Sequence, residues 1–184
     1  NMQIKDCVAV LTGAGSGIGR ALAVALARSG CHLALVDLNP DSLAETATQA
    51  RALGARVSEH PTDVSDRSAG AALPSAVVAE HGSVDLLINN AGVALGGTFD
   101  QVSEENFDWL MSINFDAVVT LCRAFLPLLR QRPEARIVNI SSLFGLITPA
   151  GQTAYCASKF AVRGFSNALR LELTNTNVGV TVVH

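Results

Sequence analysis

Short runs of consecutive apolar residues alternate with longer amphipathic stretches along the whole chain. The apolar runs are rich in Val, Ile, Leu and Ala, and they cover residues 7–11, 32–36, 56–60, 84–89, 136–140 and 178–183. Runs without polar alternation are typical of strands that are buried on both faces. With a helical stretch after each strand, this pattern predicts βαβ units and an α/β fold with a doubly wound parallel sheet.

Most of the predicted helices begin or end at a recognisable capping residue. The helices are expected at 18–29, 40–53, 66–80, 103–130 and 153–175. Gly30, Gly54 and Gly82 follow the first three, and glycine is favoured just past a helix C-terminus. Ser103 is the expected N-cap of the longest helix, and Pro127 is a candidate kink near its end.

The last predicted helix carries two neighbouring apolar stripes. One consists of the small residues Ala157, Ala161, Gly164 and Ala168, and the other of Val162, Phe165, Leu169 and Leu173. Together they cover about half of the helix circumference, more than packing on one sheet face requires. A subunit interface, and hence a homodimer or homotetramer, is the expected use of the surplus. A further segment of the same chain is the alternative cover.

Composition and charge exclude several classes of partner. The 184 residues are 49% hydrophobic and 16% charged, which fits one globular domain over residues 1–184. A net charge of −3 leaves no basic excess for nucleic acid or anionic membrane. No membrane span is expected, because Arg123 interrupts the longest apolar run, 117–129. The four cysteines lack metal-type spacing, so we expect reduced thiols, a cytoplasmic location and no metal site.

A glycine-rich segment, TGAGSGIG, joins the first strand to the first helix. At such a position the pyrophosphate of a dinucleotide binds backbone N–H groups at the positive end of the helix dipole. Side chains would block that approach, which explains the glycines. The candidate cofactor-binding residues are Gly13, Gly15, Ser16, Gly17, Ile18 and Gly19. A tight structural turn is the alternative reading of the glycines alone.

Asp37 ends the second strand, close to the interval at which an acidic residue accepts hydrogen bonds from the adenosine ribose. Its carboxylate would repel a 2′-phosphate, and neither Ala14 nor Ser16 offers a compensating positive charge. Arg20 is the nearest cation, but it lies one residue into the helix and could as easily point to solvent. The sequence therefore favours NAD over NADP. A cap for the helix that starts near Pro40 is the alternative role of Asp37.

Tyr155 and Lys159 stand four residues apart on a predicted helix, so their side chains share one face. An ammonium beside a phenol favours the phenolate, which makes Tyr155 a candidate acid and base. Ser142 ends the fifth strand, at the sheet edge where ligands bind in such folds. Its hydroxyl is a candidate hydrogen-bond partner for a substrate oxygen, and a turn or capping serine is the alternative. Ser141 is expected to point to the other side of the strand.

Together these motifs resemble the short-chain dehydrogenase/reductase family, of the compact type with TGxxxGxG and YxxxK. The resemblance implies six parallel strands in the order 3-2-1-4-5-6. It also implies that Tyr155 is the catalytic acid and base, that Lys159 holds the nicotinamide ribose, that Ser142 binds the substrate oxygen, and that Asn114 holds a water. Asp63 and Val64 would contact the adenine, and Asn90, Ala91 and Gly92 the side of the adenosine ribose.

The implied activity is hydride transfer between NAD(H) and an alcohol or ketone. Leu143, Phe144, Leu146 and Ile147 point to a hydrophobic substrate, although packing under the last helix would explain them equally well. A protein that binds NAD as a sensor or scaffold, without turnover, is the rival hypothesis. The family continues past its sixth strand with a Pro-Gly turn, a substrate loop, a helix and a seventh strand, so we expect sequence beyond His184.

Overall fold

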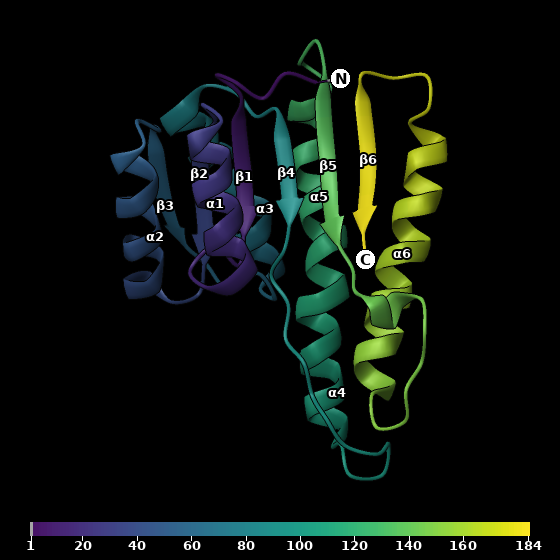
Figure 1. The fold of residues 1–184 in the computed structure, drawn as a ribbon. Coiled ribbons are helices and arrows are strands. Elements are labelled where there is room, and N and C mark those ends of the chain that lie inside the picture. Colours follow the sequence, from purple (N-terminus) through teal and green to yellow (C-terminus); the bar gives the residue numbers. More distant parts are fainter. Residues whose placement is uncertain (1) are drawn as a thin grey trace.

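Six parallel strands form one sheet in the order β3-β2-β1-β4-β5-β6, as predicted. The computed structural model describes residues 2–184 (Figure 1). The strands are β1 Val8–Thr12, β2 His32–Asp37, β3 Val57–Pro61, β4 Leu86–Asn89, β5 Ala135–Ile140 and β6 Val178–Val183. The order reverses between β1 and β4, and ligands bind at such a reversal in open α/β sheets.

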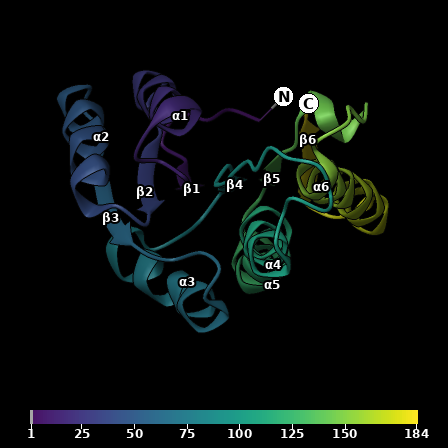
Figure 2. The ribbon, with the colours of Figure 1, turned by 90° about the horizontal axis from the view of Figure 1, so that it is seen from below.

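Helices cover the two faces of the sheet in separate layers (Figure 2). Helices α1, Gly17–Arg28, and α2, Pro40–Ala52, lie on one face, while α3, Arg67–His81, α5, Ala117–Leu129, and α6, Thr153–Glu172, lie on the other. Successive side chains of a strand point to opposite faces of the sheet and pack under the two helix layers. Leu11 packs into the cluster under α1 and α2, whereas Val10 packs into the one under α3, α5 and α6.

The boundaries of the strands and of the first three helices agree with the sequence pattern to within two residues. Each of these helices is followed by the predicted glycine, and Gly30, Gly54 and Gly82 all have positive φ. Ser103 caps its helix by accepting a hydrogen bond from the backbone N–H of Asn106.

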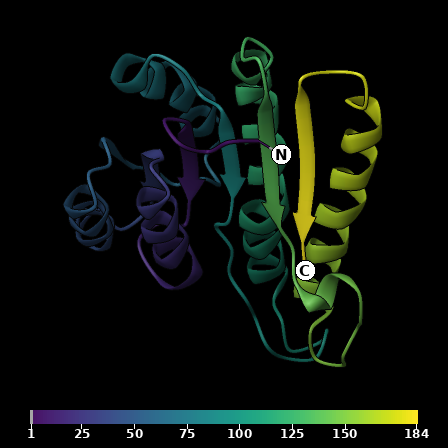
Figure 3. The same cartoon turned by 45° about the horizontal axis from the view of Figure 1, so that its top comes forward.

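The longest helix departs from its prediction in the middle rather than at its ends. Helix α4, Glu104–Met111, and α5 are joined by a π-helical turn, Ser112–Asp116, without a break in the helix. Pro127 lies inside α5 and does not end it. Figures 1 and 3 show that α4 and the start of α6 extend beyond the ends of the strands.

The continuous helix Glu104–Leu129 is long and apolar enough to pass a length and composition test for a membrane span, with a mean hydropathy of 1.4. Its second half, however, supplies Leu121, Phe125 and Leu129 to the core under the sheet. Helix α5 thus behaves as the core helix of an α/β fold, in agreement with the expectation of no membrane span.

Candidate active site

A cavity of about 540 Å³ lies at the carboxyl ends of the strands, where the strand order reverses between β1 and β4. The turn after β1, the ends of β2 and β3, the loop after β4, the π-helical turn and the start of α6 all contribute to its wall. Thirteen of the predicted residues line it: Gly13, Ser16, Gly17, Ile18, Gly19, Asp37, Asp63, Val64, Asn90, Ala91, Gly92, Tyr155 and Lys159. Gly15, Asn114 and Ser142 lie outside this lining.

The turn between β1 and α1 leaves its backbone open toward the cavity. Ser16 occupies the N-cap position of α1, but its side chain makes no capping hydrogen bond, so the first N–H groups of the helix are not capped by it. Apart from the neighbouring residues and the backbone of α1 itself, no atom lies within 4 Å of where a Cβ of Gly17 would be. Free N–H groups and open space together fit the phosphate of a dinucleotide.

Asp37 is tied to the glycine-rich turn. Its Oδ2 accepts a hydrogen bond of 2.8 Å from the backbone N–H of Gly15, and its Oδ1 accepts one of 3.0 Å from that of Asn39. Asn39, rather than Asp37, caps α2, because the Asn39 side chain accepts from the N–H groups of Asp41 and Ser42. The capping role that we considered for Asp37 is therefore wrong, and its carboxylate lines the cavity instead.

Asn90 holds the other side of the turn. Its Nδ2 donates to the carbonyl oxygens of Thr12 and Gly13, at 3.1 and 3.3 Å. The Thr12 hydroxyl in turn accepts from the backbone N–H groups of Asn90 and Ala91, both at 3.0 Å. The motif NNAG therefore joins the end of β4 to the end of β1 and fixes the shape of the glycine-rich turn. Thr12 is the first residue of the TGAGSGIG segment, but its spacing alone does not indicate this role.

Asn114 lies in the π-helical turn and is buried. Its Oδ1 accepts from the backbone N–H of Val93 and its Nδ2 donates to the carbonyl of Val93, both at 2.8 Å. The same Nδ2 donates to the Ser158 hydroxyl at 3.1 Å. Asn114 thus connects the long helix, the loop after β4 and α6 just behind the cavity wall.

Lys159 is almost completely buried, with 5% of its surface exposed. Its Nζ donates to the carbonyl of Ile140 at 3.2 Å and lies 5.6 Å from the centre of the Tyr155 ring. Burial lowers the pKa of Lys159 to about 8. A Cβ at Gly92 would lie 3.4 Å from Asn114 Oδ1 and 3.5 Å from Lys159 Nζ, so these groups gather around the Gly92 backbone.

Ser142 caps a short turn. Its hydroxyl accepts from the backbone N–H of Phe144 at 3.2 Å, which makes it the N-cap of the 3₁₀ turn Leu143–Gly145. Ser141 lines the cavity, and its hydroxyl donates to the backbone carbonyl of Lys159 at 3.0 Å. The sequence pattern predicted Ser142 at the site and Ser141 on the other side of the strand. Ser141 is in the cavity lining and Ser142 lies just beyond it, next to Ser141 in the chain, so the role of Ser142 stays a prediction.

Several apolar residues line the cavity without being marked by any motif. Trp109 and Ile113 come from the long helix, and Val93 and Ala94 from the loop after β4. Trp109 is 44% exposed although it is the largest side chain in the protein. Its position one helical turn before Ile113 is the signal that could have placed both residues on the cavity side of the helix.

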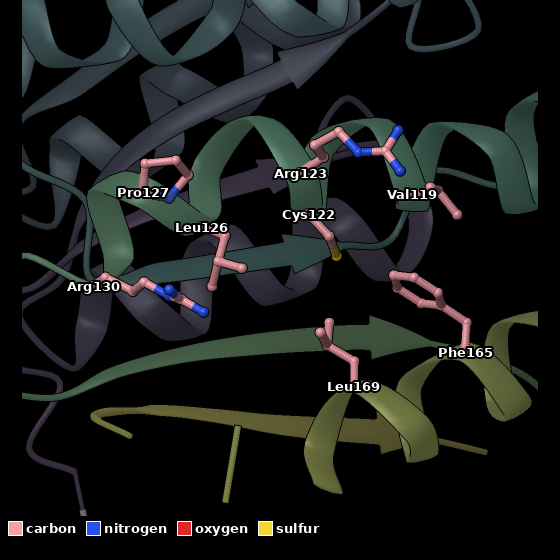
Figure 4. A pocket seen from close by; sticks show the side chains of 8 residues that line it. All are labelled: Val119, Cys122, Arg123, Leu126, Pro127, Arg130, Phe165 and Leu169. Carbon is pink, nitrogen blue, oxygen red and sulfur yellow. The ribbon is translucent and has the colours of Figure 1, made fainter. Parts of the chain in front are cut away.

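A second hollow, of about 400 Å³, lies between α5 and α6. Figure 4 shows its lining of Val119, Cys122, Arg123, Leu126, Pro127, Arg130, Phe165 and Leu169. None of the candidate catalytic residues reaches it. Within residues 2–184 no group of three or more His, Cys, Asp or Glu side chains is arranged to hold a metal ion.

Known proteins with the same arrangement support the site's assignment to one family. The family model "short chain dehydrogenase" matches residues 7–184. The "Putative oxidoreductase SadH" of Mycobacterium tuberculosis is 49% identical over 96% of this chain, and the chain spans 65% of that relative's length.

Solved structures agree. A crystal structure of a short-chain dehydrogenase/reductase from Burkholderia phymatum in complex with NAD has a TM-score of 0.96 and 38% identity, over 99% of this chain and 66% of that one. A metagenomic short-chain oxidoreductase in complex with NADP has a TM-score of 0.93 and 35% identity, over 98% and 82%. The chain therefore belongs to the short-chain dehydrogenase/reductase family of oxidoreductases.

Proposed function

We propose that this chain transfers a hydride between NAD(H) and an alcohol or ketone, with Tyr155 as the acid and base. One observation carries the proposal. The cavity that begins at the glycine-rich turn also reaches Tyr155 and Lys159, so a single dinucleotide along the sheet edge would meet both. The nicotinamide supplies the hydride chemistry when it is bound.

The side chains around Tyr155 support proton transfer at its hydroxyl. The phenol donates its proton to a substrate oxygen when a ketone is reduced, and accepts one when an alcohol is oxidised. The Lys159 Nζ lies 5.6 Å from the centre of the Tyr155 ring, within the range of a cation–π contact. Asn114 Oδ1 accepts one hydrogen bond and keeps a second lone pair, which fits a water that passes protons between Lys159 and solvent.

Ser142 is proposed to orient the substrate oxygen. Its Oγ accepts from the N–H of Phe144, which leaves its own hydrogen free to donate. Phe144 packs edge-on against the Tyr155 ring, with 6.0 Å between the ring centres, so the Ser142 turn is joined to the catalytic residue. A substrate oxygen between the two hydroxyls would receive a hydrogen bond from each.

NAD is the proposed cofactor rather than NADP. Asp37 lines the cavity with its carboxylate, which suits the two free hydroxyls of an adenosine ribose and disfavours a 2′-phosphate. Asp63 and Val64 are proposed to contact the adenine, and Ala91 and Gly92 the adenosine ribose. The solved relatives hold either NAD or NADP, so the preference rests on Asp37.

A hydrophobic alcohol or carbonyl compound is the proposed substrate. Leu143, Leu146 and Ile147, which follow Ser142, are 56%, 43% and 50% exposed. These three side chains are therefore not packed under α6, whereas Phe144 is half-buried and packs against Tyr155 of α6, as in the alternative explanation. Exposed apolar side chains beside a polar catalytic centre favour an apolar ligand.

We further propose a cytoplasmic homo-oligomer. The four cysteines are free thiols, as expected for a reducing compartment. The small-residue stripe of α6 supports self-association, because Ala157, Gly164 and Ala168 are exposed. No other part of the described chain covers them.

Replacing Tyr155 with Phe tests the proposed activity. An enzyme should lose turnover by about 10²–10⁴-fold, the usual contribution of a positioned acid and base, because the ring stays and only the exchangeable proton is lost. Turnover is followed as NADH absorbance with a panel of alcohols and ketones, and NADH binding by fluorescence titration.

The rival hypothesis, a sensor or scaffold, predicts a different outcome. A wild-type chain that binds NADH but turns over no substrate in the panel would favour it. Unchanged turnover in Tyr155→Phe would contradict the role of Tyr155, and absence of NADH binding in the wild type would contradict both functions.

A further inference from the structure

Two of the three guanidinium nitrogens of Arg20 make hydrogen bonds just outside the cofactor cavity. Its Nη2 lies 2.6 Å from the carbonyl oxygen of Gly15, 3.1 Å from that of Ser42 and 2.9 Å from Glu45 Oε2. Its Nε donates to the Thr46 hydroxyl at 3.0 Å. The guanidinium therefore lies outside the cavity lining, with 29% of the side chain exposed, and it binds the glycine-rich turn to α2.

The peptide of Gly15 is held from both sides. Arg20 binds its carbonyl, while Asp37 Oδ2 accepts from its N–H at 2.8 Å. The packing is close, because a Cβ at Gly15 would lie 2.9 Å from Asp37 Cγ and 3.1 Å from Ser42 Cβ. A shift of the Gly15 peptide would therefore also displace the hydrogen bond that orients the Asp37 carboxylate.

Charge is distributed unevenly over this arrangement. Arg20 is paired with Glu45, and their side chains are 29% and 67% exposed. Asp37 makes no ion pair among the described residues and lines the cavity. The carboxylates of Asp37 and Asp63 therefore both line the cavity, while the Arg20 guanidinium lies outside the lining and is compensated by Glu45.

We propose that Arg20 is a positioning residue for coenzyme selection. By holding the Gly15 peptide against α2 it keeps Asp37 beside the phosphate turn, and through Glu45 its own charge is withheld from a 2′-phosphate. This inference rests on the proposed NAD dependence. Arg20 acts through Gly15 and Asp37, since it does not line the cavity.

Dissociation constants for NADH and NADPH, measured by fluorescence titration on the same chain, test the proposal. Three variants are compared. Arg20→Met removes the hydrogen bonds to Gly15 and α2, and Arg20→Lys keeps the positive charge but not the planar guanidinium. Glu45→Gln removes the ion pair that compensates the guanidinium. Glu59→Gln is the matched control. It breaks a 2.9 Å ion pair between Arg51 of α2 and Glu59 of β3 and changes the net charge equally.

Arg20→Met should reduce the selectivity for NADH over NADPH by about tenfold or more, a change of about 1.4 kcal/mol, and Arg20→Lys should restore part of it. Glu45→Gln should improve NADPH binding severalfold with little change for NADH, and Glu59→Gln should alter neither ratio. The melting temperature of each variant separates loss of folding from loss of selection.

A purely structural role of Arg20 predicts a lower melting temperature with an unchanged selectivity ratio, and that result would overturn the inference. An equal gain of NADPH affinity in Glu45→Gln and Glu59→Gln would overturn it as well, because it would indicate a general charge effect. The wild-type ratio alone tests the NAD dependence. The two proposals can therefore fail separately.

Discussion

Two glycines in the turn between β1 and α1 have opposite surroundings. A Cβ on Gly19 would overlap the carbonyl oxygen of Gly13, so the protein itself fills the space beside Gly19. Gly17 has φ +52°, lines the cavity, and has no atom within 4 Å of its Cβ position. We infer that close packing within the fold requires Gly19, whereas Gly17 is required both by its left-handed backbone and by the open space that a ligand would use.

Substitution by alanine should separate these two requirements. Gly17→Ala should cost about 1–2 kcal/mol of stability, the usual penalty of the left-handed backbone for a residue with Cβ. It should also weaken NADH binding, because the methyl group would occupy the phosphate's approach. Gly19→Ala should destabilise the chain more, because the backbone of the turn must move.

Urea unfolding and NADH titration of both variants measure these effects. Wild-type NADH affinity in Gly17→Ala would contradict the phosphate site. Equal stabilities of the two variants would contradict the assignment of Gly19 to the fold.

The spacing of Tyr155 and Lys159 was enough to predict their proximity, because residues four apart on a helix always share a face. The roles of Ser141 and Ser142 depend on more than strand alternation. The strand ends at Ile140, and the backbone turns directly into a 3₁₀ turn that uses the Ser142 hydroxyl as its cap, while the Ser141 hydroxyl is bonded to the Lys159 carbonyl. The role predicted for Ser142 stays a prediction.

A chain of hydrogen bonds joins the edge strand β3 to the C-terminal end of α3. Arg56 Nε contacts His81 Nδ1 at 3.3 Å, His81 Nε2 contacts the Ser58 hydroxyl at 2.8 Å, and that hydroxyl contacts His60 Nε2 at 2.7 Å. Because Arg56 only donates, His81 carries its hydrogen on Nε2 and Ser58 donates to His60. The chain therefore requires both histidines to be neutral.

Stability should fall in mildly acidic solution for this reason. Burial lowers the pKa of both His60 and His81 below the ordinary 6.5, and for His81 the Arg56 charge adds to the effect while Glu80 opposes it. Below about pH 6.5 the unfolded chain binds more protons than the folded one, so stability is present above that pH and is lost as the pH falls.

Urea unfolding at pH 7.5 and 5.5 measures this dependence. His81→Gln keeps a donor toward Ser58 but cannot titrate, so its stability should change less between the two pH values. His184→Gln, an exposed histidine outside the chain of hydrogen bonds, is the control. An equal decrease in the pH dependence of stability in both variants would contradict the assignment of this dependence to the hydrogen bonds of His81.

Helix and strand boundaries were predictable where their signals are local. Asn39, Asp66 and Ser103 cap their helices through their own side chains, and Gly82 ends α3 in the left-handed conformation. The π-helical turn had no such signal. It coincides with the hydrogen bonds between Asn114 and Val93, which are 21 residues apart in sequence and meet only in the folded protein.

The outer surface of the molecule is not uniformly polar. Both apolar stripes predicted on α6 exist, but they are covered to different extents: Val162 and Leu173 are buried, whereas Gly164 and Ala168 are exposed. Phe165 and Leu169 of the larger stripe are half-buried and line the hollow between α5 and α6. A flat stripe of small residues allows close approach of another helix, and a second copy of the chain is its proposed partner.

Gly164→Arg should convert the proposed oligomer to a monomer. No atom lies within 4 Å of a Cβ at Gly164, so the new side chain meets no obstacle in a single copy, and arginine favours a helix more than glycine does. Analytical ultracentrifugation measures the mass, and Leu171→Arg, at a position that is 76% exposed, is the control. An unchanged mass in Gly164→Arg would exclude this stripe from the interface.

The order of the strands was predictable from the family resemblance that the motifs carry, and the structure has this order. The place of the cavity was predictable from the succession of βα units, because carboxyl ends of parallel strands share one edge. What the cavity binds was less predictable. Trp109, Ile113 and Val93 shape it from segments that have no motif, and their meeting depends on the path of the long helix.

The wide turn at Ser112–Asp116 acts as a one-residue insertion within an otherwise regular helix. One extra residue rotates everything before it by about 100° relative to everything after it. Deletion of a single residue there would let an unbroken α-helix form. In that helix α4 and α5 would be rotated relative to each other, so α4 could keep its present orientation only if α5 no longer packed into the core. A related protein whose sequence is one residue shorter in this segment should therefore have a differently shaped cavity entrance.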